Sequence, residues 1–168
     1  MITVEYCRQM ARYNAWQNRG QMKAFKALTP MALRKDRKAF FSSIFGTANH
    51  LLWADQLWMS RFDGGFGPAG SGALSAELHD NLQLYLDDRM RTDARITRWA
   101  ERLSQVDLVG PLTYHSAIAD RELSKPMGLC AVHFFNHQTH HRGQLHAMLT
   151  AAGQTLGDTD LVFMPDEL

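Results

Sequence analysis

The chain has 168 residues, of which 45% are hydrophobic and 21% charged, and its 18 basic residues nearly balance its 17 acidic ones. This composition predicts one globular domain, residues 1–168, and the formal net charge of +1 gives no electrostatic reason to expect nucleic acid as a partner. The apolar runs are shorter than the roughly 20 residues that cross a bilayer, and the N-terminus lacks the apolar stretch of a secretory signal. We therefore expect a cytoplasmic protein with no membrane partner, and the two cysteines fit a reducing compartment.

The spacing of apolar side chains predicts four long helices. The first covers residues 3–28, where aromatic and aliphatic residues recur at helical intervals before a Thr-Pro pair. The second covers residues 41–62, and the glycine-rich segment 63–73 after it predicts a loop. A third helix is predicted from Ser75 to Leu103, with Ser75 as an imperfect capping signal. The fourth is predicted from Pro126 to Ala152, with Gly153 beyond its C-terminal end.

The stretch between the third and fourth helices departs from the helical pattern. PLTYHS alternates loosely between apolar and polar residues, and RELSKP follows after a short polar connection. These two segments predict a small hairpin, or alternatively a long ordered crossover, before the last helix. Because four amphipathic helices are present and the third connection is long, the sequence predicts an all-α four-helix bundle with a crossover.

The sequence contains eight histidines, and five of them lie within fourteen positions of the predicted fourth helix. His133, His137 and His141 are spaced four residues apart, which places them on one face of that helix. The outer two are separated by roughly 12 Å along the helix axis, whereas a metal lies about 2 Å from a ligating nitrogen. One pair that includes His137 can therefore bind an ion, and the spacing leaves His133, His141 and the neighbouring His140 open as its partner.

A third ligand has to come from another helix. His50 is the best candidate because it lies in the middle of the strongly apolar segment ANHLLWAD. His79 has polar neighbours and is expected to face water. His115 lies in the predicted hairpin, where it could lie above the site without binding the metal.

Three segments together show a resemblance to a known family. FNHQTHHRGQLHAMLTAAG, ANHLLWADQLWMSRF and ARYNAWQNRG resemble the DinB family, which is grouped with the YfiT-like metalloenzymes. The resemblance covers essentially the whole chain and implies His50, His137 and His141 as the metal ligands. It also implies an up-up-down-down four-helix bundle, a homodimer, and one divalent ion, nickel or zinc.

Three neutral imidazoles leave a bound ion with its full charge and at least one open position, which is typical of a catalytic site. The resemblance implies a metal-dependent enzyme, a thiol-dependent transferase or a hydrolase, that acts on a small-molecule substrate with a low-molecular-weight thiol as cofactor. The alternative is a non-catalytic, metal-stabilised bundle with a stress-response or binding role. A third interpretation is a metal-free interaction module that dimerises through its aromatic first helix.

Neighbouring side chains suggest further roles. Tyr114 and His115 are candidate proton donors, and Cys130 is expected to be a buried structural cysteine. Arg142 could bind an anionic substrate or a partner carboxylate, or be an ordinary exposed helix arginine. Candidates to accept the second N–H of the ligating histidines are Asn49, Asp55, Asn136 and Gln144.

Overall fold

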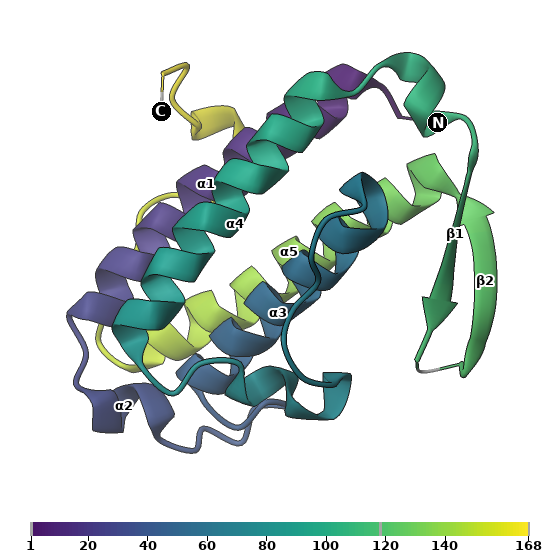
Figure 1. Ribbon diagram of the computed structural model, residues 1–168. Helices are drawn as coiled ribbons and strands as arrows, with labels where there is room; N and C mark the ends of the chain where they lie inside the picture. The colour runs from purple at the N-terminus through teal and green to yellow at the C-terminus, as the bar shows by residue number, and fades with distance from the viewer. Residues whose placement is uncertain (1, 118, 168) are drawn as a thin grey trace.

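The computed structural model describes residues 2–117 and 119–167 and is mostly helical (Figure 1). The long helices are α1 (Val4–Lys26), α3 (Ile44–Asp63), α4 (Leu82–Arg102) and α5 (Met127–Ala151). The shorter elements are α2 (Pro30–Arg34), the 3₁₀ turns η1 (Gly72–Glu77), η2 (Gln105–Leu108) and η3 (Leu161–Phe163), and the antiparallel strands β1 (Pro111–Ser116) and β2 (Arg121–Pro126). Four long helices and a small hairpin before the last of them are thus confirmed. In the described part of the chain, no helix has both the length and the apolar character needed to span a membrane.

Local capping explains where the first and last long helices begin and end. The side chain of Thr3 accepts a hydrogen bond from the backbone N–H of Tyr6 and starts α1. Thr29 was expected only to follow the first helix, but its hydroxyl caps the additional short helix α2. Gly153 follows α5 with φ +80°, and its N–H donates to the carbonyl of Thr150. The predicted glycine at the end of the last helix is therefore confirmed.

Two predicted helix starts are too early. Helix α3 begins at Ile44 rather than Phe41, because Ser42 has φ +61° and Ser43 supplies the cap to the N–H of Gly46. Helix α4 begins at Leu82 rather than Ser75, because its cap is the side chain of Asn81. Ser75 lies in η1 instead.

Contacts between side chains fix the direction of each helix. Helices α1 and α4 are antiparallel, since Asn14 donates to Asp93 at 2.9 Å while Arg8, earlier in α1, donates to the carbonyl of Leu103, after the end of α4. Helices α3 and α4 are parallel, since Arg89 pairs with Asp55, and Asp63 pairs with a later arginine of α4.

Helix α5 completes the arrangement. It is antiparallel to α3, because the ring of His50 lies 4.8 Å from that of His141 while Trp58 lies 5.0 Å from His133. The chain therefore runs one way in α1, the opposite way in α3 and α4, and back again in α5 (Figure 1). The up-up-down-down order is wrong: α1 and α3 do not point the same way. The sequence predicts the crossover in the long connection before the last helix. In the structure, the crossover is instead the segment between α3 and α4.

This crossover segment, residues 64–81, returns along the side of α3. Two consecutive parallel helices require it, because the chain must travel back the roughly 30 Å length of a 20-residue helix. The indole N–H of Trp53 donates to the carbonyl of Ala69 at 3.1 Å, and Asn49 donates to the carbonyl of His79 at 3.0 Å. These contacts attach the crossover to α3 at two points.

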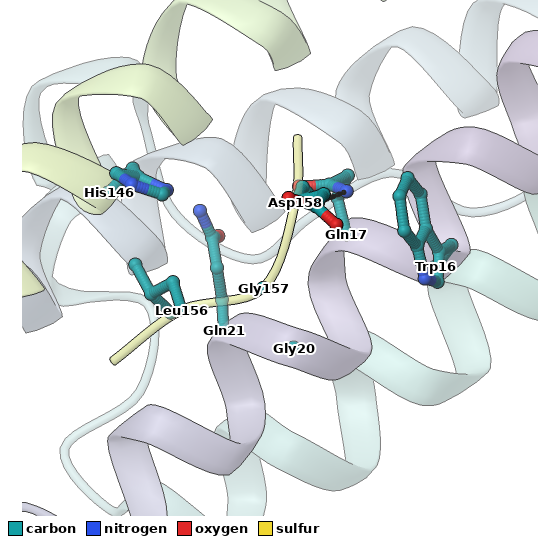
Figure 2. A pocket seen from close by; sticks show the side chains of 8 residues that line it. All are labelled: Trp16, Gln17, Gly20, Gln21, His146, Leu156, Gly157 and Asp158. Carbon is teal, nitrogen blue, oxygen red and sulfur yellow. Dashed lines mark hydrogen bonds between the residues drawn. The ribbon is translucent and has the colours of Figure 1, made fainter. Parts of the chain in front are cut away.

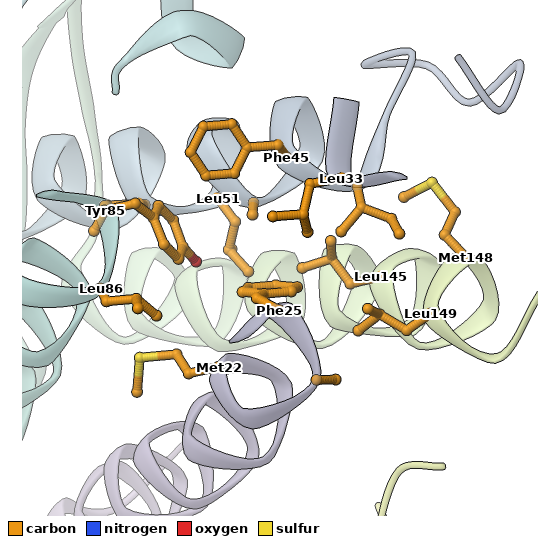
Figure 3. Packing of buried hydrophobic residues seen from close by; sticks show 14 residues of the cluster. Met22, Phe25, Leu33, Phe45, Leu51, Tyr85, Leu86, Leu145, Met148 and Leu149 are labelled. Atoms are coloured by element: carbon orange, nitrogen blue, oxygen red, sulfur yellow. The ribbon is translucent and has the colours of Figure 1, made fainter. Parts of the chain in front are cut away.

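Apolar side chains form a cluster near each end of the helices. Figure 3 shows the cluster nearer α2, in which Phe25, Leu51, Tyr85 and Leu145 come from the four long helices. The other cluster includes Ile96 and buried aromatic residues of α4 and α5. Both clusters draw on the apolar faces that the sequence periodicity predicts.

Charged and polar side chains form a buried network with members on all four long helices. Arg89 of α4 is 1% exposed and lies 2.7 Å from both Asp55 of α3 and Asp93 of its own helix. Gln138 of α5 donates to Asp55 at 3.0 Å, and Asn14 of α1 donates to Asp93. Buried charges require such partners, because an unpaired charge in a protein interior is very costly.

We predict that Arg89→Met lowers the free energy of unfolding by about 3–5 kcal/mol, because two buried carboxylates lose their cation. Urea unfolding followed by circular dichroism measures this loss. The control is Arg91→Met, whose guanidinium is exposed and lies 3.5 Å from Asp88; its effect should stay below about 1 kcal/mol. Equal effects of the two substitutions would contradict the proposed importance of the network.

Candidate metal centre

Three histidines from two helices converge in the structure. His50 comes from α3, and His137 and His141 come from α5; one ring nitrogen of each lies within 4.8 Å of the others. The Nε2 atoms of His137 and His141 are 3.1 Å apart. A tetrahedral zinc ion with bonds of about 2.0–2.1 Å separates neighbouring ligand nitrogens by roughly 3.3 Å. The pair from His137 and His141 matches this spacing, and the three nitrogens together form a group that could hold one small divalent ion.

The structure shows which of the candidate histidines lie together. His137 and His141 lie one turn apart on α5, and both face His50 because α3 runs antiparallel beside them. His133, one turn further, instead packs against Trp58. His140 lies beside the ring of His141 but is exposed. His50, His137 and His141 are therefore the histidines that the fold brings together.

Gln144 orients the ring of His141. The amide oxygen of Gln144 lies 2.8 Å from Nδ1 of His141, and its amide nitrogen lies 3.1 Å from Nε2 of His140. Because an amide oxygen only accepts, Nδ1 of His141 carries the proton and Nε2 presents its lone pair to the centre of the site. The expectation that Gln144 contacts a site histidine is confirmed.

Ser75 contacts the ring of His50, a contact that the sequence does not predict. Its hydroxyl oxygen lies 2.9 Å from Nδ1 of His50, and the residue is buried at 2% exposure. This contact leaves Nε2 of His50 free to face the other two rings. Ser75 reaches His50 only because the crossover returns along α3. The sequence instead suggests Ser75 as a helix cap, so this contact is not predicted.

Among the described residues, the other suggested ring partners form no hydrogen bond with the three histidines. Asp55 belongs to the buried ion network, Asn136 is exposed, and Asn49 exchanges hydrogen bonds with the backbone of His79. The prediction that His79 faces water is wrong, because its Nε2 lies 2.9 Å from a carboxylate oxygen of Asp88.

An aromatic ring covers one side of the site. Phe41 stacks on His50 with ring centroids 3.8 Å apart and planes inclined by 19°, and it lies 5.7 Å from the ring of His141. Phe41 precedes α3 and reaches the histidines because the backbone turns sharply at Ser42. Such a ring limits the access of water to that side of the histidines.

Burial keeps the three imidazoles neutral. It lowers the pKa of His50 to about 4, with a smaller contribution from the charge of His141. It lowers the pKa of His137 to about 3, and the neighbouring histidines add to the effect. The pKa of His141 is lowered for the same main reason. Neutral imidazoles are the form that binds metal, so the site is ready for an ion at neutral pH.

The remaining suggested residues lie elsewhere. Arg142 is buried rather than exposed, and its guanidinium donates to the side chains of Asn14 and Thr139. Tyr114 packs against Trp58, and His115 is exposed on the hairpin. Cys130 is buried and free, as predicted.

A cavity lies apart from the histidine site, between α1, α5 and the C-terminal segment (Figure 2). The side chains of Gln17, Gln21 and His146 face it, and Gln17 donates to the backbone carbonyl of Asp158. The residues that line this cavity include none of His50, His137 and His141.

Comparison with known proteins gives one match. The family model described as the DinB family matches residues 1–167, essentially the whole chain. No curated protein and no solved structure gives a match.

We predict that the metal-free protein loses stability as the pH falls from about 6.5 toward 4. In the unfolded chain a histidine takes up a proton near pH 6.5, whereas folded His50 does so only near pH 4. Between these values the unfolded state binds more protons, so acid favours unfolding. Urea midpoints at pH 7 and pH 4.5 measure the loss.

The variant His50→Gln should show a smaller loss over this pH range, and His115→Gln, on the exposed hairpin, should behave like the unmodified chain. An identical pH dependence in all three proteins would show that burial of His50 does not govern the acid response.

Proposed function

This chain belongs to the DinB family, and from that membership and the site geometry we propose that His50, His137 and His141 bind one divalent ion, nickel or zinc. The observation that carries the proposal is the convergence of three neutral imidazole nitrogens within 4.8 Å. Imidazole is a preferred ligand of both metals. Ser75 and Gln144 hold two of the rings with Nε2 directed to the common centre, which is the usual arrangement around a ligating histidine.

We further propose that the protein is a metal-dependent enzyme, a thiol-dependent transferase or a hydrolase, acting on a small molecule. Three neutral ligands leave an open position, and a bound ion would supply a Lewis acid that lowers the pKa of a water molecule or a low-molecular-weight thiol. The chain itself would orient the ligating rings and, through Phe41, exclude water from one side. The single domain and the cytoplasmic location expected from the composition, the four-helix bundle expected from the helical pattern, and the homodimer implied by the family resemblance are part of the same proposal.

We predict that the purified protein binds about one divalent ion per chain and that His137→Ala abolishes this binding, because only two donors remain on different helices. Elemental analysis after dialysis against nickel or zinc measures the content. His146→Ala is the control, since this residue lies five positions beyond His141 and lines the separate cavity, so the substitution should leave the content unchanged. Unchanged metal content in His137→Ala would disprove the assignment of the site.

We predict that Ser75→Ala weakens metal binding by about tenfold or more, the usual effect of removing a hydrogen-bond partner of a ligating histidine. Competition with a chromogenic chelator gives the affinity. Ser60→Ala is the matched control, because the Ser60 hydroxyl donates only to a backbone carbonyl of its own helix. Thermal melting of the metal-free variants shows whether either change affects folding, and equal affinities in both would contradict the role of Ser75.

Chelation separates an enzyme from a structural metal protein. The enzyme proposal expects a metal-dependent reaction of a thiol with an electrophile, or hydrolysis of an ester, that stops in the His137→Ala variant. The alternative, a non-catalytic metal-stabilised bundle, expects chelation to lower the melting temperature without any such turnover. The second result, across a panel of thiols, electrophiles and esters, would overturn the enzymatic part of the proposal.

A further inference from the structure

Arg61 lies near the C-terminal end of α3, and its guanidinium is flanked by aromatic rings. Among the residues that the structure describes, its nitrogens neither pair with a carboxylate nor donate a side-chain hydrogen bond. The nearest carboxylate in sequence, that of Asp63, is bound by Arg95 at 2.6 and 2.8 Å. Burial lowers the pKa of Arg61, so its charge is partly desolvated and weakly compensated.

Two aromatic rings hold this guanidinium in place. Its central carbon lies 4.6 Å from the ring centroid of Trp58 and 4.1 Å from that of Tyr114. The two rings are 5.5 Å apart and inclined by 68°, so they form a corner in which the guanidinium rests. Cation–π contacts fix the position of the charge but use none of its N–H donors, which stay available to an acceptor.

Arg61 lies on the same side of the helix pair as the three histidines. On α3 it follows His50 by eleven residues, about three turns and roughly 16 Å along the axis. The ring of Trp58 on α3 contacts that of His133 on α5. The ring of His133 in turn lies 5.9 Å from that of His137. A continuous series of aromatic rings therefore joins the guanidinium to the candidate metal centre.

We propose that Arg61 is a carboxylate-binding residue that anchors the far end of an elongated small molecule whose other end binds at the three-histidine site. The inference rests on the proposed function for the position of that other end. A guanidinium donates two parallel hydrogen bonds to a carboxylate, and here it is oriented before the ligand arrives, which reduces the entropy that binding costs. The ligand class is an organic acid with a metal-binding group several bonds from its carboxylate.

Thiols of graded length test the proposal. The protein is loaded with Co²⁺, and its visible spectrum is titrated with mercaptopropionate, mercaptohexanoate and mercaptoundecanoate, each paired with the corresponding mercaptoalcohol. At the chain length that spans the two sites, we expect the acid to bind about tenfold or more tightly than the alcohol, because a charge-assisted hydrogen bond is gained. Arg61→Gln should abolish this preference, and Arg61→Lys, which lacks the planar fork, should retain only part of it.

The control variant is Arg98→Gln, which removes an exposed arginine of α4 and should leave the preference for the acid intact. Equal binding of acid and alcohol at every length, or an undiminished preference in Arg61→Gln, would overturn the inference. Thermal melting of each variant identifies any loss of folding.

A metal-free measurement separates this inference from the proposed function. Hexanoate is titrated into the metal-free protein, and the NMR signal of the Arg61 Nε–H is followed, with Arg61→Lys used to assign it. A saturable shift in that signal supports the carboxylate site even if no thiol perturbs the cobalt spectrum, in which case only the proposed function fails. The absence of a shift, together with no preference for the acids, overturns the inference while thiol binding to cobalt leaves the proposed function standing.

Discussion

The ion pair between Arg89 and Asp55 is the constraint on which the rest of the structure depends. It joins two parallel helices in the interior, where neither charge is stable without the other. Asp93 is a second carboxylate partner of the same arginine. Asn14 donates to Asp93 and accepts from Arg142, and so links a second arginine to the pair. The two arginines and two aspartates of this group have no net charge together. The protein interior can therefore hold four charged side chains without an uncompensated charge.

This network also sets the register between α3 and α5. Gln138 donates to Asp55, and Gln138 is the residue after His137, while Asp55 follows His50 by five positions. A shift of either helix that broke this hydrogen bond would also move His50 away from the two histidines of α5. The interaction that stabilises the interior therefore determines the geometry of the site, although none of its members contacts the histidine nitrogens.

Local signals in the sequence were sufficient for much of this description. Helical periodicity located the four long helices, and the four-residue spacing of His137 and His141 placed both on one face. Local signals do not encode the direction in which successive helices pack, so the family resemblance led to the wrong order. The contacts of Ser75 with His50 and of His79 with Asn49, 25 and 30 positions apart in sequence, depend on the return of the crossover along α3. The pairing of His79 with Asp88 of α4 depends on the crossover as well. The burial of Arg142 likewise depends on α1, more than a hundred residues away.

The attachment of the crossover to α3 has a consequence for changes in chain length. Between Gly64 and Gly70 the segment bends through two left-handed glycines and exposes Phe66 almost completely, so an inserted or deleted residue there disturbs surface contacts, such as that of Ala69 with Trp53, and leaves the contact of Ser75 with His50 in place. Beyond Ser71 the same change would shift Ser75 away from His50 and His79 away from Asn49. Related sequences should therefore vary in length within the first half of this segment and keep a fixed spacing from Ser75 to the cap of α4.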